Sequence, residues 1–165
     1  MKEDRNERCV VREGSAEAAQ EVSPPPRAIS AHPNLVTQSG LRALEHALAD
    51  SRQALNAAQT IEDANDRRRA LELAARDVRY FAERVGSAIP QPEPSDTVVV
   101  AFGSQVTILR DDDRRQTFRI VGEDEADPRS GSIAYVSPLA RLLIGKRAGE
   151  AVELDGREIE VVAIE

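Results

Sequence analysis

The stretch that decides the fold of the C-terminal half is Phe118–Lys146, FRIVGEDEADPRSGSIAYVSPLARLLIGK. Its β-prone start ends at Gly122, and a second β-prone run follows at 133–136. Ser137 has the character of a helix N-cap, and Pro138 suits the first helical position because a missing N–H costs nothing there. The stretch therefore predicts strand, acidic turn, strand and helix.

Four carboxylates crowd into five positions between the two strands: Glu123, Asp124, Glu125 and Asp127. Their mutual repulsion is tolerated cheaply only in water, so they predict a solvated turn. A metal site is the alternative, but the run contains no His and lacks the spacing of an EF-hand loop, which favours the solvated turn.

Further strands are predicted on both sides of this stretch. Asp111–Asp113 and Asp155-Gly156 supply turns between them. The predicted strands are 97–101, 105–109, 116–121, 133–136, 151–154 and 158–164. Residues 97–165 therefore predict a small α+β domain, a curved antiparallel sheet with one helix on a face.

The region 35–88 is predicted to be an antiparallel coiled-coil hairpin. Thr37 is a plausible N-cap, and apolar residues recur every seven positions in each half, at Leu41, Leu48 and Leu55 and then at Leu71, Val78 and Val85. The polar segment Thr60–Asp66 interrupts the pattern and predicts the turn. Packing of both helices within an ordinary globular bundle is the alternative.

Two segments flank this hairpin. Residues 1–34 have mixed charge followed by Pro24, Pro25 and Pro26, which predicts a disordered arm. Residues 89–96 contain three prolines at alternate positions, which cannot continue a helix and predict an extended linker.

Composition narrows the function classes. The net charge of −7 disfavours direct coating of nucleic acid, which requires clustered Lys and Arg. The single Cys9 suits a reducing compartment. The longest apolar run, Val98–Phe102, is far too short to span a bilayer, and the N-terminus has no apolar core of a secretion signal. These features predict a cytoplasmic protein without a membrane partner.

The motifs of the C-terminal half carry a family resemblance. The segments IVGEDEAD, Ser-Pro-Leu-Ala-Arg and Leu-Ile-Gly-Lys occur in this order, preceded by Val100–Thr107 and followed by Gly149–Leu154. Together they resemble the C-terminal domain of the bacterial GreA/GreB transcription elongation factors over about 98–165. The resemblance implies an FKBP-like fold for this domain.

The resemblance also implies a partner and an activity. Gre factors bind bacterial RNA polymerase at the rim of its secondary channel, and their coiled coil reaches toward the catalytic centre. Acidic residues at the hairpin tip help to hold a second Mg²⁺ there, and the polymerase then cleaves backtracked RNA by two-metal chemistry. This chain would therefore be a monomer that is not itself an enzyme, has no cofactor or metal of its own, and meets nucleic acid only through the elongation complex.

The tip carboxylates that could assist Mg²⁺ are Glu62, Asp63 and Asp66. The sequence departs from the family here, because the acidic tip pattern is absent and the hairpin is shorter by about seven residues, roughly 10 Å of helix rise. Asp63 or Asp66 could instead cap the second helix.

The predicted polymerase-docking residues are Glu123, Asp124, Glu125, Asp127, Ser137, Pro138, Leu139 and Arg141. Electrostatic complementarity to a basic surface would orient the encounter. Two other functions remain open. One is a polymerase-bound regulator that does not stimulate cleavage, and the other is a peptidyl-prolyl isomerase, for which the domain offers only the aromatic residues Phe102, Phe118 and Tyr135.

Overall fold

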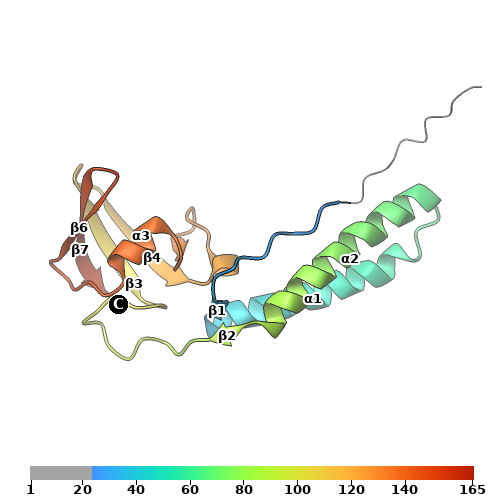
Figure 1. The fold of residues 1–165 in the computed structure, drawn as a ribbon, viewed down its shortest axis with the longest axis horizontal. Coiled ribbons are helices and arrows are strands. Elements are labelled where there is room, and N and C mark those ends of the chain that lie inside the picture. Colours follow the sequence, from blue (N-terminus) through green and yellow to red (C-terminus); the bar gives the residue numbers. More distant parts are fainter. Residues whose placement is uncertain (1–23) are drawn as a thin grey trace, which may run out of the picture.

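The structure is a computed structural model that describes residues 24–165, and in it a helical hairpin projects from a sheet domain (Figure 1). Eleven elements follow in order: β1 (Leu35–Val36), α1 (Gln38–Ala58), α2 (Ala64–Gly86), β2 (Ile89–Pro90), β3 (Gln105–Arg110), β4 (Arg115–Val121), the 3-10 helix η1 (Glu123–Glu125), β5 (Ser132–Ala134), α3 (Pro138–Leu143), β6 (Ala151–Leu154) and β7 (Arg157–Ile164). The architecture is α+β, as predicted. No helix of this described part is long and apolar enough to cross a membrane.

The hairpin consists of α1 and α2 packed side by side. Thr37 is the N-cap of α1, as predicted, and its hydroxyl accepts a hydrogen bond from Gly40 N at 3.0 Å. Side chains buried along the helix pair include Leu44, Leu48, Ala58 and Ala74, whereas the predicted heptad positions Leu41 and Leu55 are only half-buried. Two helices alone bury one face each, which leaves the rest of this seam partly open to water.

The sheet has the strand order β5-β4-β3-β7-β6. Apolar side chains of all five strands, together with two from α3, form the core: Val106, Ile108, Phe118, Ile120, Ile133, Ala140, Leu143, Val152, Ile159, Val161 and Ile164, with Val100 from the loop before β3. The alternating burial of Val106 and Ile108 on β3 and of Phe118 and Ile120 on β4 is the two-residue period of a strand with one face on the core. α3 begins at the predicted N-cap Ser137 and at Pro138.

Two predictions about the sheet are wrong. The sheet is mixed rather than antiparallel, because β5 pairs with β4 in parallel through Ile133 and Ile120. The segment 97–101 is not a strand. Val98 is 57% exposed, and Val100 instead pairs with the turn after α3, donating its N–H to Lys146 O at 2.8 Å and accepting from Gly145 N at 2.8 Å.

The predicted boundaries at the hairpin base also differ from the structure. Residues 1–23 of the predicted arm, which include Cys9, lie outside the described residues. Asn34, the last residue of that arm, is 5% exposed, and its carbonyl accepts from Ile89 N at 2.8 Å. Ile89–Pro90, the start of the predicted linker, pairs in parallel with Leu35–Val36. Backbone pairing between residues so distant in sequence produces no local sequence pattern, so these boundaries could not be predicted.

The acidic turn is not the solvated loop that was predicted. Glu125 reaches the base of α1, where Thr37 donates to its carboxylate from the backbone N–H, at 2.9 Å to Oε1, and from the hydroxyl to Oε2. A carboxylate here also lies at the positive end of the α1 dipole. The approach depends on two glycines, because a methyl group at Gly40 would overlap the Glu125 side chain and one at Gly122 would overlap the Leu35 carbonyl oxygen.

Replacing Gly40 by alanine is expected to destabilise the protein, although glycine-to-alanine changes in helices usually stabilise. The new methyl would overlap the Glu125 carboxylate, and overpacking of this kind costs about 1–3 kcal/mol. Urea unfolding of Gly40→Ala measures the loss. Gly86→Ala is the control, since a methyl at this α2 position meets nothing within 4 Å. A Gly40→Ala protein as stable as Gly86→Ala would contradict the close approach.

Candidate functional site: the acidic turn, the hairpin tip and the α3 face

The second contact of the acidic turn is an ion pair at the end of α2. Arg84 is 3% exposed, and its Nε donates to Asp124 Oδ2 at 2.5 Å. The other oxygen of this carboxylate accepts from the Tyr80 hydroxyl at 2.5 Å. Asp124 thereby holds two side chains that lie one helical turn apart on α2. Removing one partner of a buried pair leaves an uncompensated charge, so loss of either side chain would weaken the attachment of the hairpin.

The carboxylates of the acidic turn therefore point in different directions. Glu125 and Asp124 point to the bases of α1 and α2, and Glu123 is half-buried with a carboxylate oxygen that has no hydrogen-bond partner. Asp127 is exposed and makes its side-chain hydrogen bonds within its own turn, where the Ser130 hydroxyl and the Arg129 N–H bond its carboxylate and lower its pKa. Asp124 and Glu125 are thus engaged with the hairpin and Glu123 is half-buried, whereas the hydrogen bonds of the Asp127 carboxylate stay within its own turn.

Two tyrosine hydroxyls lie at the junction between the hairpin and the sheet domain. Burial, the hydrogen bond to Asp124 and the charge of Asp124 raise the pKa of Tyr80, because each disfavours the phenolate. The hydroxyl of Tyr135 donates to Pro33 O at 2.6 Å, and burial and the nearby Glu123 charge raise its pKa as well. Both hydroxyls are therefore held protonated as hydrogen-bond donors.

The hairpin tip is organised as a helix start. Asp63 is the N-cap of α2, and its Oδ1 accepts from the backbone N–H groups of Asn65 and Asp66 at 2.9 Å each. Arg67 donates from Nη1 to the carbonyls of Ile61 and Glu62, at 2.8 and 3.2 Å. Of the two residues that could cap this helix, the structure selects Asp63.

The tip carboxylates do not converge. Glu62 and Asp66 are exposed, and Asp66 lies 3.9 Å from an Arg69 nitrogen. Within 24–165 no three His, Cys, Asp or Glu side chains are arranged to hold a metal ion. The tip can therefore offer separate carboxylate oxygens to an external cation, with Arg67 and Arg69 close by as competing charges.

The α3 face holds the remaining predicted docking residues. The Ser137 hydroxyl accepts from Ala140 N at 3.3 Å and so is used as a cap, while Leu139 packs partly against the core. Pro138 and Arg141 are exposed. The Nη2 of Arg141 lies 3.3 Å from His32 Nε2, so the chain before β1 borders this face.

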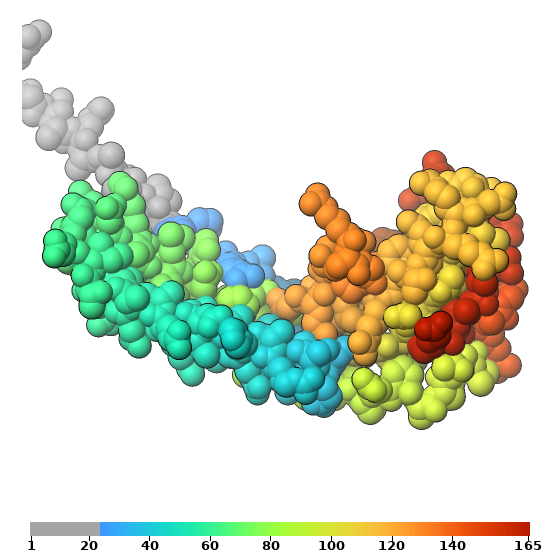
Figure 2. Space-filling view, turned by 180° about the vertical axis from the view of Figure 1, so that it is seen from behind, coloured from blue at the N-terminus to red at the C-terminus, as the bar shows by residue number. Residues whose placement is uncertain are grey.

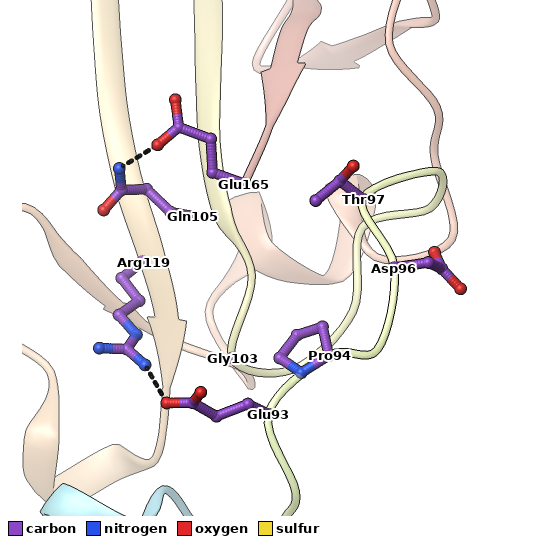
Figure 3. Close-up of a pocket in the computed structure, with 8 residues that line it drawn as sticks. All are labelled: Glu93, Pro94, Asp96, Thr97, Gly103, Gln105, Arg119 and Glu165. Carbon is purple, nitrogen blue, oxygen red and sulfur yellow. Dashed lines mark hydrogen bonds and ion pairs between the residues drawn. The ribbon is translucent and has the colours of Figure 1, made fainter.

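A polar cavity of about 290 Å³ lies where the linker crosses the sheet (Figure 3). Its walls carry an ion pair between Arg119 and Glu93 at 3.6 Å, and Gln105 donates to Glu165 at 2.9 Å. Pro94 packs against Gly103, which holds the linker close to the start of β3. The cavity is lined mainly by charged and polar side chains, and none of the aromatic residues considered for prolyl isomerisation lines it. Of these, Phe118 is in the core and Phe102 packs edge-on against Tyr135.

Sequence reasoning missed Arg84 and Tyr80 as partners of the acidic turn. Arg84 is a charged residue beside Val85 in the apolar repeat of the second helix, and a cation at that position is a signal for a buried partner. The segment Thr37–Gly40, a cap followed by a helical glycine, was a second signal for a close approach.

Comparisons with known proteins agree with the resemblance found in the sequence. Residues 94–165 match the family described as "Transcription elongation factor, GreA/GreB, C-term". The transcription elongation factor GreB of Neisseria meningitidis serogroup B is 44% identical over 96 residues, which cover 54% of this chain and 59% of that protein. GreA of Vibrio parahaemolyticus is 42% identical over 84 residues, covering 50% of this chain and 53% of that protein. The chain thus spans little more than half the length of these relatives.

Solved structures show a weaker overall likeness. The GreA factor homolog 1 (Gfh1) of Thermus thermophilus is 24% identical, with a TM-score of 0.38 over 81% of this chain and 99% of that one. A GreA/GreB factor of Nitrosomonas europaea is 18% identical, with a TM-score of 0.39 over 79% and 97%. At these scores the superpositions carry no argument about how hairpin and sheet domain are arranged.

The fold defines an α+β protein in which a helical hairpin projects from a small mixed-sheet domain. Its sheet domain, residues 94–165, matches the C-terminal domain of the GreA/GreB transcription elongation factors.

The two tyrosines should titrate above their ordinary pKa of about 10. Since the pKa is raised on folding, the stability they contribute is present below about pH 10 and is lost as pH rises through the folded-state pKa. With two Tyr and no Trp in the chain, absorbance at 295 nm reports only these groups. Asp124→Asn should lower the Tyr80 pKa and leave that of Tyr135 unchanged.

Asp127→Asn is the control for this titration, since its carboxylate bonds only within its own turn. It should leave both phenol pKa values where they are. Equal titration curves for the native protein and Asp124→Asn would contradict the contact between Asp124 and Tyr80.

Proposed function

We propose that this protein is a transcription elongation factor that binds bacterial RNA polymerase at its secondary channel and modulates elongation. The observation that carries the proposal is a GreA/GreB C-terminal domain from which a helical hairpin projects. The 21 residues of α1 give the hairpin a length of about 31 Å, enough to enter a channel while the sheet domain stays outside. The FKBP-like description of the sheet domain belongs to the same proposal.

Docking would use the exposed part of the predicted surface. Asp127, Pro138 and Arg141 face water, and the lowered pKa of Asp127 keeps its carboxylate charged toward a basic partner. Asp124 and Glu125 act indirectly, because they hold the hairpin in position on the sheet domain. In this function the protein acts as a cytoplasmic monomer, any hydrolysis is done by the polymerase, and nucleic acid is met only within the elongation complex.

The tip geometry favours modulation without transcript cleavage, the second function that the sequence left open. Assisting a Mg²⁺ ion requires free carboxylate oxygens, but Asp63 uses Oδ1 to cap α2. Arg67 is fixed beside the tip by its bonds to Ile61 O and Glu62 O, and its positive charge disfavours a cation there. Such a tip could obstruct or modulate the catalytic centre without completing a shared metal site.

Backtracked elongation complexes incubated with the protein and Mg²⁺ test this proposal. We expect the protein to bind the complexes and to change the elongation rate without producing shortened transcripts. Glu62→Gln plus Asp63→Ser removes two of the three tip carboxylates and should likewise give no shortened transcripts, and the introduced serine hydroxyl would still cap α2.

Glu153→Gln on the exposed edge strand β6 is the control, since it removes one carboxylate far from the tip in sequence. Shortened transcripts that vanish in the tip variant but persist in Glu153→Gln would show that the tip does assist cleavage. Failure to bind polymerase at low salt would overturn the proposed function as a whole. Turnover of a prolyl peptide would instead favour the isomerase.

A further inference from the structure

The segment before β1 contacts both parts of the molecule. Residues 24–34 lie against the α2 side of the hairpin and lead to its base (Figure 2). Arg27 lies on α2, while His32 and Pro33 reach Arg141 and Tyr135 of the sheet domain. The chain thus passes from the middle of one hairpin helix to the α3 side of the sheet domain within a few residues.

The hairpin end of this segment is a specific seat for a guanidinium group. The Cζ of Arg27 lies 3.7 Å from the centre of the Tyr80 ring and 4.8 Å from that of Phe81, and the two rings pack edge to face at 5.2 Å. An Arg27 nitrogen also lies 3.7 Å from Asp77 Oδ1. Ring faces and a carboxylate attract the same cation, and a planar guanidinium stacks on a ring better than an ammonium does.

The other end is fixed by hydrogen bonds at the hairpin base. Pro33 O accepts from Tyr135, and Asn34 Nδ2 donates to Arg84 O at 2.7 Å and to Ser87 Oγ at 3.2 Å. Asn34 is also buried. This end stays attached even when Arg27 leaves its seat.

The spacing between the two ends limits movement. The five residue-to-residue steps from Arg27 to His32 span at most about 18 Å when the chain is fully extended. The acidic turn holds α2 at Arg84 and Tyr80, and Arg27 adds a contact at Asp77, three residues or about 4.5 Å of helix nearer the tip than Tyr80. Because Arg27 contacts α2 beyond the acidic turn, this contact resists a tilt of the hairpin about that turn.

We propose that residues 24–34 form a strap that sets the angle between hairpin and sheet domain, with Arg27 on Tyr80, Phe81 and Asp77 as its releasable latch. Asn34 is the permanent anchor, and release of Arg27 leaves the acidic turn as the remaining contact that opposes tilting. The device belongs to the isolated protein and does not depend on polymerase binding.

Paired spin labels test the angle directly. Spin labels on Asn65→Cys near the tip and Glu153→Cys on β6, in a Cys9→Ser background, report the distance between the hairpin and the sheet domain. We expect a narrow distance distribution with the native strap, a broader one in Arg27→Ala, and an intermediate width in Arg27→Lys, which keeps the charge but not the planar stack. Arg42→Ala, an exposed arginine of α1, is the control and should leave the distribution narrow. An unchanged distribution in Arg27→Ala would overturn the proposal.

Trypsin provides a second readout in which Arg27 itself is kept. Cleavage after Arg27 requires its side chain to leave the rings, so the rate follows the released population. Phe81→Leu should accelerate this cleavage about two- to fivefold, the effect of losing a partly exposed cation–π contact. Leu73→Ala, at a 46% exposed position of α2, is the control and should not change the rate. Equal rates in Phe81→Leu and the native protein would show that Arg27 is not latched and would likewise overturn the proposal.

Discussion

Two carboxylates of one short turn hold this molecule in shape. Glu125 receives the backbone N–H and hydroxyl of Thr37 at the start of α1, and Asp124 receives Arg84 near the end of α2. The start of α1 and the end of α2 lie together at the base of the hairpin, so one turn of the sheet domain holds both helices. This close approach requires glycine at positions 40 and 122, because a side chain at Gly40 would exclude Glu125 and one at Gly122 would displace the chain before α1. The projection of the hairpin therefore follows from a few charge-assisted hydrogen bonds.

This arrangement changes the meaning of the acidic cluster. Carboxylates on a surface attract basic partners, but those enclosed at a domain junction position the parts of one protein. Asp127, outside the junction, remains a surface charge, whereas Asp124 and Glu125 define the direction in which the tip points. A partner that binds the α3 face would thus find the hairpin already oriented, which lowers the conformational entropy lost on binding.

The sequence was most informative where structure is determined locally. The structure confirms Thr37 and Ser137 as helix caps, Pro138 at a first helical position and strands at 105–109 and 116–121. All of these depend on residues close in sequence. The same reasoning failed for the predicted strand 97–101, whose β-propensity is overridden because Val100 pairs with the turn after α3.

The prediction of a solvated acidic turn was wrong for a related reason. The repulsion among its carboxylates was considered without Arg84, which precedes Asp124 by 40 residues and comes close only in the folded chain. For the candidate site, Asp63 could be recognised as a cap or a tip carboxylate, but no pattern could choose between them. No single residue predicts that a partner binds the sheet domain. That proposal depends on the order of several motifs in the sequence.

The central claim is that the acidic turn holds the hairpin on the sheet domain, and a double-mutant cycle on Arg84 and Asp124 tests it most directly. Unfolding free energies are measured for Arg84→Met, Asp124→Ala and the double variant. The structure predicts that the double variant loses less than the sum of the single losses, by about 1–3 kcal/mol, because each single change leaves the other charge without its partner. Losses that add to within about 0.5 kcal/mol would contradict the claim.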